Sequence, residues 1–316
     1  MTLRPGWDEW RSPWMRSPAA AVEWWVGAAK AIRRGSIFPA QSRRPWAPAP
    51  GGTSQELPRW SPLRRMLREQ SCFVHSHHRL TIPGLTAPLR LLQLSDVHLR
   101  GPGAWLDGLC RSLTPLRPDL LVLTGDMVTA GWSRDAAEQF VNALPAAPLG
   151  RFHVTGNWET ILGPTPLGWT ELLSSHGIRC LDNRRTRAGP VLLAGVEDLL
   201  AGDAQLETVL GPPTDRPLIL LAHTPMTIDE VVRRSDWCDR VQLVLSGHSH
   251  AGQIRLPLVG SPWLPKGTGE YVGGWYEVQG VPLFVSRGVG WSLLPLRLWC
   301  PPELAVIELT PARSER

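Results

Sequence analysis

Cysteines are few in this chain of 316 residues, and none of them belongs to a C-x-x-C pair. A disulfide framework or a zinc knuckle would show paired cysteines at regular spacing, so neither is expected. The pattern favours a reducing compartment, and we expect a cytoplasmic protein. The five cysteines are odd in number and widely separated: Cys72, Cys110, Cys180, Cys238 and Cys300.

Long apolar runs are also missing. A membrane-spanning helix needs roughly 18 to 20 apolar residues, and charges interrupt every candidate in the N-terminal half. The beginning of the chain lacks the basic, apolar and small-residue order of a signal peptide. We therefore expect neither a membrane span nor a signal peptide.

A net positive charge is missing outside the N-terminal region. Residues 1–70 hold 12 Lys or Arg against five Asp or Glu, a net charge of +7, whereas the whole chain carries only +5. The other 246 residues are therefore slightly acidic, at −2. A nucleic-acid groove needs its positive charge on the folded domain, so no specific nucleic-acid partner is expected.

The first 70 residues form a basic extension rich in Pro, with seven of the 16 Trp of the chain. Apolar residues recur at helical spacing from Ala20 to Ile32, which predicts a short amphipathic helix. Trp and Arg on such a helix suit peripheral contact with the inner membrane through residues 1–70. Packing of the helix on the following domain or on a second subunit is the alternative.

From residue 71 to 316, β-rich runs alternate with helical segments, which predicts one α/β domain without internal repeats. Helices are predicted over 134–144, with Ser133 as N-cap, and over 227–234. The arginine-rich run 184–187 is expected to be a solvated loop. Strands are predicted over 89–95, 119–124, 152–155, 191–195, 218–222, 241–246, 283–286 and 304–309.

Five of these strands end in polar side chains, in the segments LSDVH, TGD, TGNWE, AHTP and SGHSH. Ligands bind at the carboxyl ends of strands in open α/β sheets, so we expect these side chains to converge on one crevice. The candidates are Asp96, His98, Asp126, Asn157, His223, His248 and His250.

Two carboxylates, one amide and four imidazoles are a metal site's donors, and they suit Mn, Fe or Zn better than Ca. Taken singly, a histidine after a strand is often a core residue, and the Asp of a Gly-Asp turn is often a cap. Their joint occurrence indicates a metal site. The i, i+2 spacing of Asp96 with His98, and of His248 with His250, places each pair on one side of an extended chain.

The series LSDVH, GD, GN, H and GHSHAGQ resembles the signature of calcineurin-like metallophosphoesterases. The segments that begin at Gln253 and Val285 are similar to those of the bacterial YkuE-type phosphodiesterase branch. The resemblance covers roughly residues 75–310. It implies an α/β fold in which two mixed β-sheets pack as a sandwich with flanking helices.

The resemblance also implies two divalent metal ions and a role for each candidate. Two ions about 3.5–4 Å apart can activate a shared water and neutralise charge on a phosphoryl group. Gly125, Gly156 and Gly247 would keep the turns tight. Asp126, Asn157 and His223 are carried over as catalytic residues as well as ligands. The implied ligands are Asp96, His98 and His250 for the first metal, Asn157, His223 and His248 for the second, and Asp126 as the bridge.

The sequence departs from the family at one position. The usual Gly-Asn-His block, whose histidine is thought to protonate the leaving group, reads Gly156-Asn157-Trp158-Glu159 here. Indole has one N–H donor and cannot act as an acid near neutral pH. Trp158 could instead stack on the substrate or simply fill space. Glu159 could brace the loop by hydrogen bonds.

Three explanations for Trp158 stay open. The protein could be a non-catalytic metal-binding module derived from a phosphoesterase. Another histidine could supply the acid, namely His153, His176 or one of the cluster 75–78. A third hypothesis, which we favour, is that the leaving group needs little protonation, as in a pyrophosphate bond.

The sequence therefore predicts a two-metal hydrolase of phosphodiester or pyrophosphate bonds, acting on a phosphate-ester small molecule such as a nucleotide sugar or on a lipid-linked substrate. The alternative is a non-catalytic or membrane-associated module. Arg255 and Arg287 are candidates for contacts with substrate phosphate, and salt bridging is the other interpretation. Asp198 could orient a metal-bound histidine or be a turn residue.

Overall fold

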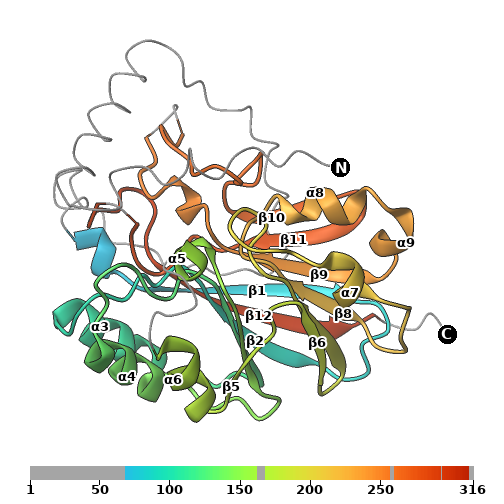
Figure 1. Ribbon diagram of the computed structural model, residues 1–316, viewed down its shortest axis with the longest axis horizontal. Coiled ribbons are helices and arrows are strands. Elements are labelled where there is room, and N and C mark those ends of the chain that lie inside the picture. The colour runs from blue at the N-terminus through green and yellow to red at the C-terminus, as the bar shows by residue number, and fades with distance from the viewer. Residues whose placement is uncertain (1–67, 162–167, 257–259, 293, 313–316) are drawn as a thin grey trace. The chain divides into compact units, whose positions relative to one another are not determined.

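The computed structural model describes residues 68–161, 168–256, 260–292 and 294–312. These residues form two six-stranded β-sheets with helices on both outer sides (Figure 1). The predicted sandwich of two mixed sheets is therefore confirmed. The predicted helix over 20–32 and nearly all of the N-terminal extension lie outside the described residues.

The first sheet has the strand order β1-β12-β2-β3-β4-β5. Strands β2 to β5 are parallel, β12 is antiparallel to β2, and β1 is parallel to β12. The parallel run brings the carboxyl ends of β2, β3 and β4 to one edge. The strands are β1 (Val74–Ile82), β2 (Leu89–Leu94), β3 (Leu120–Thr124), β4 (Arg151–Val154), β5 (Ile178–Cys180) and β12 (Glu303–Pro311).

The second sheet has the order β10-β11-β9-β8-β7-β6. Strands β7, β8, β9 and β11 are parallel, whereas β6 and β10 are antiparallel to their neighbours. The carboxyl ends of β8 and β9 are therefore also adjacent. The strands are β6 (Arg184–Ala188), β7 (Val191–Gly195), β8 (Leu218–Leu221), β9 (Val241–Ser246), β10 (Gly274–Val278) and β11 (Val281–Val285).

The central strands are apolar on both faces because both faces are covered. In β2, Leu91 packs into the core between the two sheets, while Leu92 and Leu94 pack toward the helices on the outside. This follows from the alternation of side chains along a strand. The inner core joins the sheets through residues such as Val122 and Ile219.

The helices cover the outer faces, as Figure 1 shows. Apolar residues of α3, α4 and α6 pack in one cluster with the first sheet. Those of α7, α8 and α9 pack in another with the second sheet. The helices are α3 (Ala104–Leu113), α4 (Arg134–Ala143), α5 (Asn157–Ile161), α6 (Trp169–Ser175), α7 (Leu206–Leu210), α8 (Thr227–Val232) and α9 (Ser235–Cys238), with 3-10 turns η3 (Glu69–Ser71) and η4 (His250–Gly252).

All eight predicted strands are present, and their ends differ from the predicted ones by at most two residues. The predicted cap of α4 is confirmed, because the Ser133 side chain accepts a hydrogen bond from the Ala136 amide. The prediction of a loop over 184–187 is wrong: these residues form β6, an edge strand whose three arginines are exposed. Arginines on an edge strand keep their charges in solvent, so the pattern resembles that of a loop.

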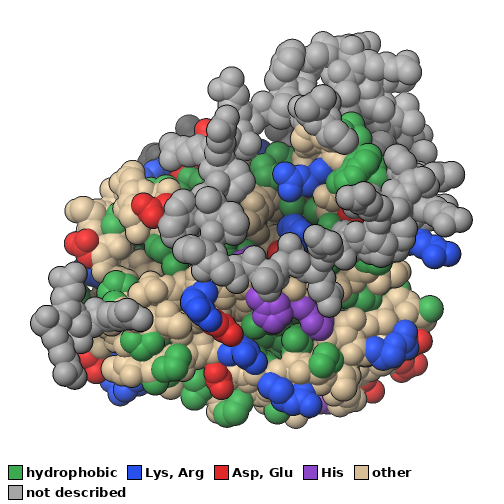
Figure 2. Space-filling model, turned by 180° about the vertical axis from the view of Figure 1, so that it is seen from behind, with side chains coloured by type: hydrophobic (Ala, Val, Ile, Leu, Met, Phe, Trp, Pro, Cys, Tyr) green, Lys and Arg blue, Asp and Glu red, His purple; other side chains and the backbone are tan. Residues whose placement is uncertain are grey.

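Figure 2 shows one face of the molecule with the described side chains coloured by type. Lys and Arg side chains are scattered there, and many lie beside Asp or Glu side chains. Within the described ranges, no helix is both long enough and apolar enough to cross a membrane.

A buried ion pair joins β12 to the end of β11. Glu303 is 3% exposed, and its two oxygens accept hydrogen bonds from the backbone amide and the guanidinium of Arg287, both at 2.9 Å. Burial alone would raise the pKa of Glu303, but the charge of Arg287 holds it well below its ordinary value. The pair therefore stabilises the fold only while Glu303 is ionised.

We predict that Glu303→Gln lowers the free energy of unfolding by up to about 3 kcal/mol, because a buried pair is broken. A depressed carboxyl pKa contributes stability above the unfolded value of about 4.3, and this contribution is lost as pH falls below it. Urea unfolding between pH 3 and pH 7 should therefore show a steeper acid loss in wild type than in the variant. Glu308→Gln, which removes exposed pairs on the same strand, is the control and should cost under about 1 kcal/mol. Equal effects of the two variants would contradict this prediction.

Candidate metal centre

The seven predicted ligands follow five strands and lie together between the two sheets. Three of the strands belong to the first sheet and two to the second, so neither sheet alone forms the centre. The side chains and the strands that they follow are Asp96 and His98 (β2), Asp126 (β3), Asn157 (β4), His223 (β8), and His248 and His250 (β9).

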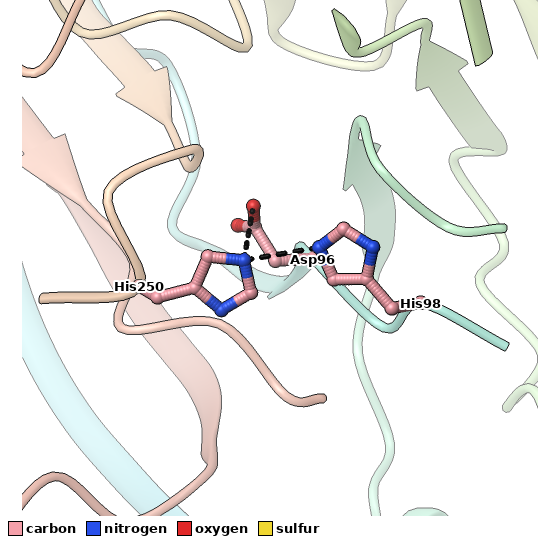
Figure 3. A group of neighbouring side chains, drawn as sticks. All are labelled: Asp96, His98 and His250. Atoms are coloured by element: carbon pink, nitrogen blue, oxygen red, sulfur yellow. Dashed lines mark hydrogen bonds and ion pairs between the residues drawn. The ribbon is translucent and has the colours of Figure 1, made fainter. Parts of the chain in front are cut away.

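The first group consists of Asp96, His98 and His250, whose potential donor atoms lie within 4.8 Å of one another. Figure 3 shows the carboxylate of Asp96 and the ring of His98 turned toward the ring of His250. The Nε2 atoms of the two histidines are 3.0 Å apart, and His250 Nε2 is 3.4 Å from Asp96 Oδ1. Two imidazole nitrogens and one carboxylate oxygen thus face a common point.

The second group contains Asp126, His223 and His248, again within 4.8 Å. Asn157 completes it, because its Oδ1 is 3.1 Å from His223 Nε2 and 2.9 Å from His248 Nδ1. The other nitrogen of each ring, which does not face Asn157, lies within hydrogen-bonding distance of a backbone carbonyl. His223 Nδ1 is 2.7 Å from the oxygen of Thr124, and His248 Nε2 is 2.6 Å from that of Lys266. Such bonds orient an imidazole for a metal.

Asp126 lies between the two groups. Its Oδ1 accepts the backbone N–H of Trp158 at 2.8 Å. Its Oδ2 is 3.3 Å from His223 Nε2 in the second group and 3.8 Å from His98 Nε2 in the first. One oxygen is therefore fixed by the backbone, and the other faces both groups, as a bridging ligand requires.

Backbone conformation at the centre is unusual. Five of the seven predicted ligands have positive φ angles between 49° and 69°, a region that few residues other than glycine adopt. Such strain costs free energy and persists where the surrounding structure imposes it, often at functional sites. The five residues are Asp96, His98, Asp126, His248 and His250.

Two predicted turn glycines leave no room for a side chain. A β-carbon on Gly156 would overlap Oδ1 of Asp126, and one on Gly247 would overlap Ser95 and Asp96. The carboxylates thus lie directly against neighbouring backbone. This explains why each of these turns contains glycine beside a predicted ligand.

The donor set fits a divalent cation. Burial lowers the pKa of His98 to about 4 and lowers that of His248, so both rings are neutral and able to bind a metal near neutral pH. Burial raises the pKa of Asp96 to about 7, and a cation beside it would restore the ionised form. Burial opposes ionisation of Asp126, but the facing ring of His223 lowers its pKa to about 2.

Glu159 braces the loops that carry Asp126 and Asn157. Its buried carboxylate accepts backbone N–H bonds from Asp126 at 2.9 Å, Met127 at 2.5 Å and Gly156 at 3.0 Å. Burial, followed by the charge of Asp126, raises its pKa to about 7. The expected bracing role is therefore confirmed, and it is carried by backbone amides rather than by a neighbouring histidine.

Trp158 is half-buried beside the first group. Its ring meets the ring of His98 edge to face, with centroids 5.9 Å apart and planes at 87°. No acid is provided at this position. The alternative histidines are engaged elsewhere: His75 with the Ser112 carbonyl, His176 with the Leu172 carbonyl, and His78 with Trp275. His153 lies on β4 between two residues of the inner core, so its side chain faces the helices.

The other predicted contacts differ in their surroundings. Arg255 is exposed, and its side chain is available to a ligand. Arg287 is paired with Glu303, which favours the salt-bridge interpretation. Asp198 accepts the hydroxyl of Thr224, next to His223, and so supports the loop rather than a histidine ring.

The sequence analysis missed Arg297. This residue is fully buried, and its Nη2 is 3.3 Å from Nδ1 of His250. A signal was present, because Arg297 is the one charged residue in the apolar stretch 293–300. A lone charge in such a stretch indicates a buried and partnered group.

We predict that Glu159→Gln lowers the free energy of unfolding by about 1–3 kcal/mol, because an amide cannot accept all of these backbone bonds. Metal content should fall as well, since both braced loops carry predicted ligands. Urea unfolding and metal analysis would measure the two effects. The control, Glu138→Gln, removes an exposed pair with Arg134 and should change stability by under about 0.5 kcal/mol. A variant no less stable than this control would rule out the brace.

Comparison with known proteins agrees with this geometry. The sequence model described as calcineurin-like phosphoesterase matches residues 89–252. Phosphodiesterase YaeI of Escherichia coli is 34% identical over 258 residues, which cover 76% of this chain and 90% of that protein. The metallophosphoesterase YkuE of Bacillus subtilis is 29% identical over 233 residues, 70% of this chain and 78% of that protein.

A longer relative is also similar. The transmembrane protein with metallophosphoesterase domain of Danio rerio is 33% identical over 246 residues. The match covers 71% of this chain and 54% of that protein, so the chain spans about half the length of this relative. Residues 89–252, which the family model matches, include all five strands that precede the predicted ligands. The chain belongs to the calcineurin-like phosphoesterase family.

Proposed function

We propose that the protein is a two-metal hydrolase of phosphodiester or pyrophosphate bonds. The position of Asp126 carries this proposal, because one of its oxygens faces both donor groups at 3.3 and 3.8 Å. Two divalent cations at such a centre supply Lewis-acid chemistry that lowers the pKa of water and offsets charge on phosphate. Mn, Fe or Zn fits the mixture of imidazole and carboxylate donors.

The residues of the chain orient this chemistry. Asp126 is fixed by the Trp158 amide, and Asp96 accepts the His248 amide with both oxygens at 3.0 Å. Neither carboxylate can turn away without breaking a backbone hydrogen bond. A rigid donor set needs little reorganisation during reaction, which is how preorganised sites lower barriers.

Replacing a predicted ligand should abolish turnover. We predict that Asp126→Asn and His223→Ala each reduce the rate of hydrolysis by more than about 100-fold. Mutation of residues that only hydrogen-bond to metal ligands already lowers metal affinity or activity by about 10- to 100-fold. Chelation should have the same effect, and added Mn²⁺ should restore wild-type activity. His77→Ala removes an exposed histidine of β1 and should retain full activity. Wild-type protein that binds two metals without turning over any phosphate ester would support the binding-module alternative.

The presence of Trp158 in place of a histidine supports the hypothesis that the leaving group departs without being protonated. A phosphate or nucleotide is acidic enough to leave as an anion beside a cation, whereas an alkoxide is not. No alternative histidine contacts the described donor groups through a hydrogen bond, which favours this explanation over a substitute acid. A molecule with a pyrophosphate bond, such as a nucleotide sugar, is therefore the substrate that we favour.

We predict that Trp158→His raises turnover of an alkyl phosphodiester by at least about tenfold, because general acid catalysis contributes about 10²- to 10⁴-fold. Turnover of a pyrophosphate substrate should change much less. The measurement is a pair of steady-state assays on both proteins, with Trp158→Phe as the aromatic control. The same factor of change for both substrates would refute the leaving-group explanation.

An apolar substituent on the substrate is favoured by exposed apolar residues that follow three of the predicted ligands along the chain. The exposed large hydrophobic residues of the described chain are Ile161, Met226 and Leu256. Each lies within six residues after a predicted ligand, at the ends of the segments that carry Asn157, His223 and His250. We therefore include lipid-linked phosphate esters among the proposed substrates. Such substrates would place the protein at the periphery of the inner membrane.

A further inference from the structure

Arg297 is one of the largest fully buried side chains of the described structure. A buried guanidinium loses its hydration, and even a well-paired one stabilises a fold weakly if at all. In the described part of the chain, no carboxylate pairs with Arg297 directly. A charge held at such a cost calls for a role beyond packing.

The partners of Arg297 show what it holds. Its Nε donates to the carbonyl of Gly290 at 2.7 Å, and its Nη1 donates to those of Arg287 at 3.0 Å and Cys300 at 3.1 Å. Its Nη2 lies 3.3 Å from Nδ1 of His250. The guanidinium of Arg297 therefore connects the segments 287–290 and 297–300 to a predicted ligand.

The segment 287–290 also contacts the first group directly. The amide of Val289 donates to the Ser95 carbonyl at 3.0 Å, and the amide of Gly290 donates to the Asp96 carbonyl at 2.7 Å. At Gly288, an added β-carbon would lie 2.9 Å from Cβ of Asp96 and 3.3 Å from both Arg297 Nη2 and His250 Nδ1. Arg297, His250 and Asp96 thus enclose one glycine without spare room.

The two donor groups are oriented by different means. In the second group, the outer nitrogens of His223 and His248 meet backbone carbonyls of neighbouring loops. In the first group, His250 meets the guanidinium, and Nδ1 of His98 has no hydrogen-bond partner among the described residues. The first group therefore depends on Arg297 for an orienting contact that the second obtains from the backbone.

The segment 297–300 is also anchored to the domain. The amide of Trp299 donates to Oε2 of the buried Glu69 at 3.0 Å, and Trp299 has a φ of 51°, which is strained for a bulky residue. This contact keeps residues 297–300 against the domain. It also shows that Glu69, within the predicted extension 1–70, is buried against the α/β domain.

We propose that Arg297 is a positioning residue for the first metal group, fixing the ring of His250 and the segments 287–290 and 297–300 against Asp96. This inference rests on the proposed two-metal function. The flat guanidinium reaches three carbonyls and one imidazole at once. A lysine ammonium is a single point with three donors and cannot span these four acceptors.

The test is Arg297→Lys, measured by metal analysis and by the electron paramagnetic resonance of Mn²⁺-loaded protein. Wild type should bind two ions per chain with an exchange-coupled signal. The variant should keep its fold, lose about one ion per chain and show an isolated Mn²⁺ signal. A purely structural role would lower the melting temperature and leave two coupled ions, which would overturn the proposal.

Double variants identify the site that is lost. Adding Arg297→Lys to His248→Ala should remove the remaining ion, whereas adding it to His250→Ala should change nothing. The opposite pattern would assign Arg297 to the second group and overturn the proposal. Wild type that fails to bind two ions would instead refute the proposed function itself, so the two failures are distinguishable.

A second variant avoids dependence on one substitution. Gly288→Ala places a methyl group between Arg297, His250 and Asp96, and it should also cost the first ion. Its control is Gly131→Ala, which has a similar φ of 75° against 72° but no atom within 4 Å of the added carbon. The positioning role would be overturned if Gly288→Ala and Gly131→Ala had equal metal content. It would also be overturned if both Arg297→Lys and Gly288→Ala failed to fold.

Discussion

The carboxylate of Asp126 lies where the two β-sheets meet, and the arrangement of the metal centre depends on it. One oxygen is tied to the amide of Trp158, and the other faces the rings of His98 and His223. Because these rings belong to different sheets, Asp126 relates the first sheet to the second. Burial makes such a contact strong, since little water competes for the carboxylate.

Around this contact, rigidity comes mainly from backbone amides. Glu159 accepts amides from the loops after β3 and β4, and Asp96 accepts the amide of His248 from the other sheet. Carboxylates held in this way cannot follow a ligand, so the site presents its donors in one geometry. The positive φ angles at Asp96 and Asp126 are the conformational cost of that geometry.

Trp158 and Arg297 adapt the first group in different ways. Trp158 packs its ring edge-on to His98, and an indole is not an acid near neutral pH. Arg297 contacts Nδ1 of His250 and also donates to the carbonyl of Arg287, so it ties His250 to the segment 287–290. The two rings of the first group are therefore contacted by residues that have no counterparts at the second group in the described structure.

The sequence by itself determined the strands of an α/β domain and the candidate ligands, because apolar strands followed by polar ends are local patterns. The arrangement in two sheets was implied only by the resemblance to calcineurin-like metallophosphoesterases. Helix α4 could also be predicted from the sequence, because its N-cap Ser133 accepts a hydrogen bond from the amide of Ala136, only three residues along the chain. Strand β1 could not, because its histidines obscure the alternation and its place beside β12 joins distant parts of the chain. Only the tertiary structure decided that Glu159 braces Asp126 and that Arg297 meets His250. These contacts depend on how loops from different strands pack, and no spacing along the chain encodes that packing.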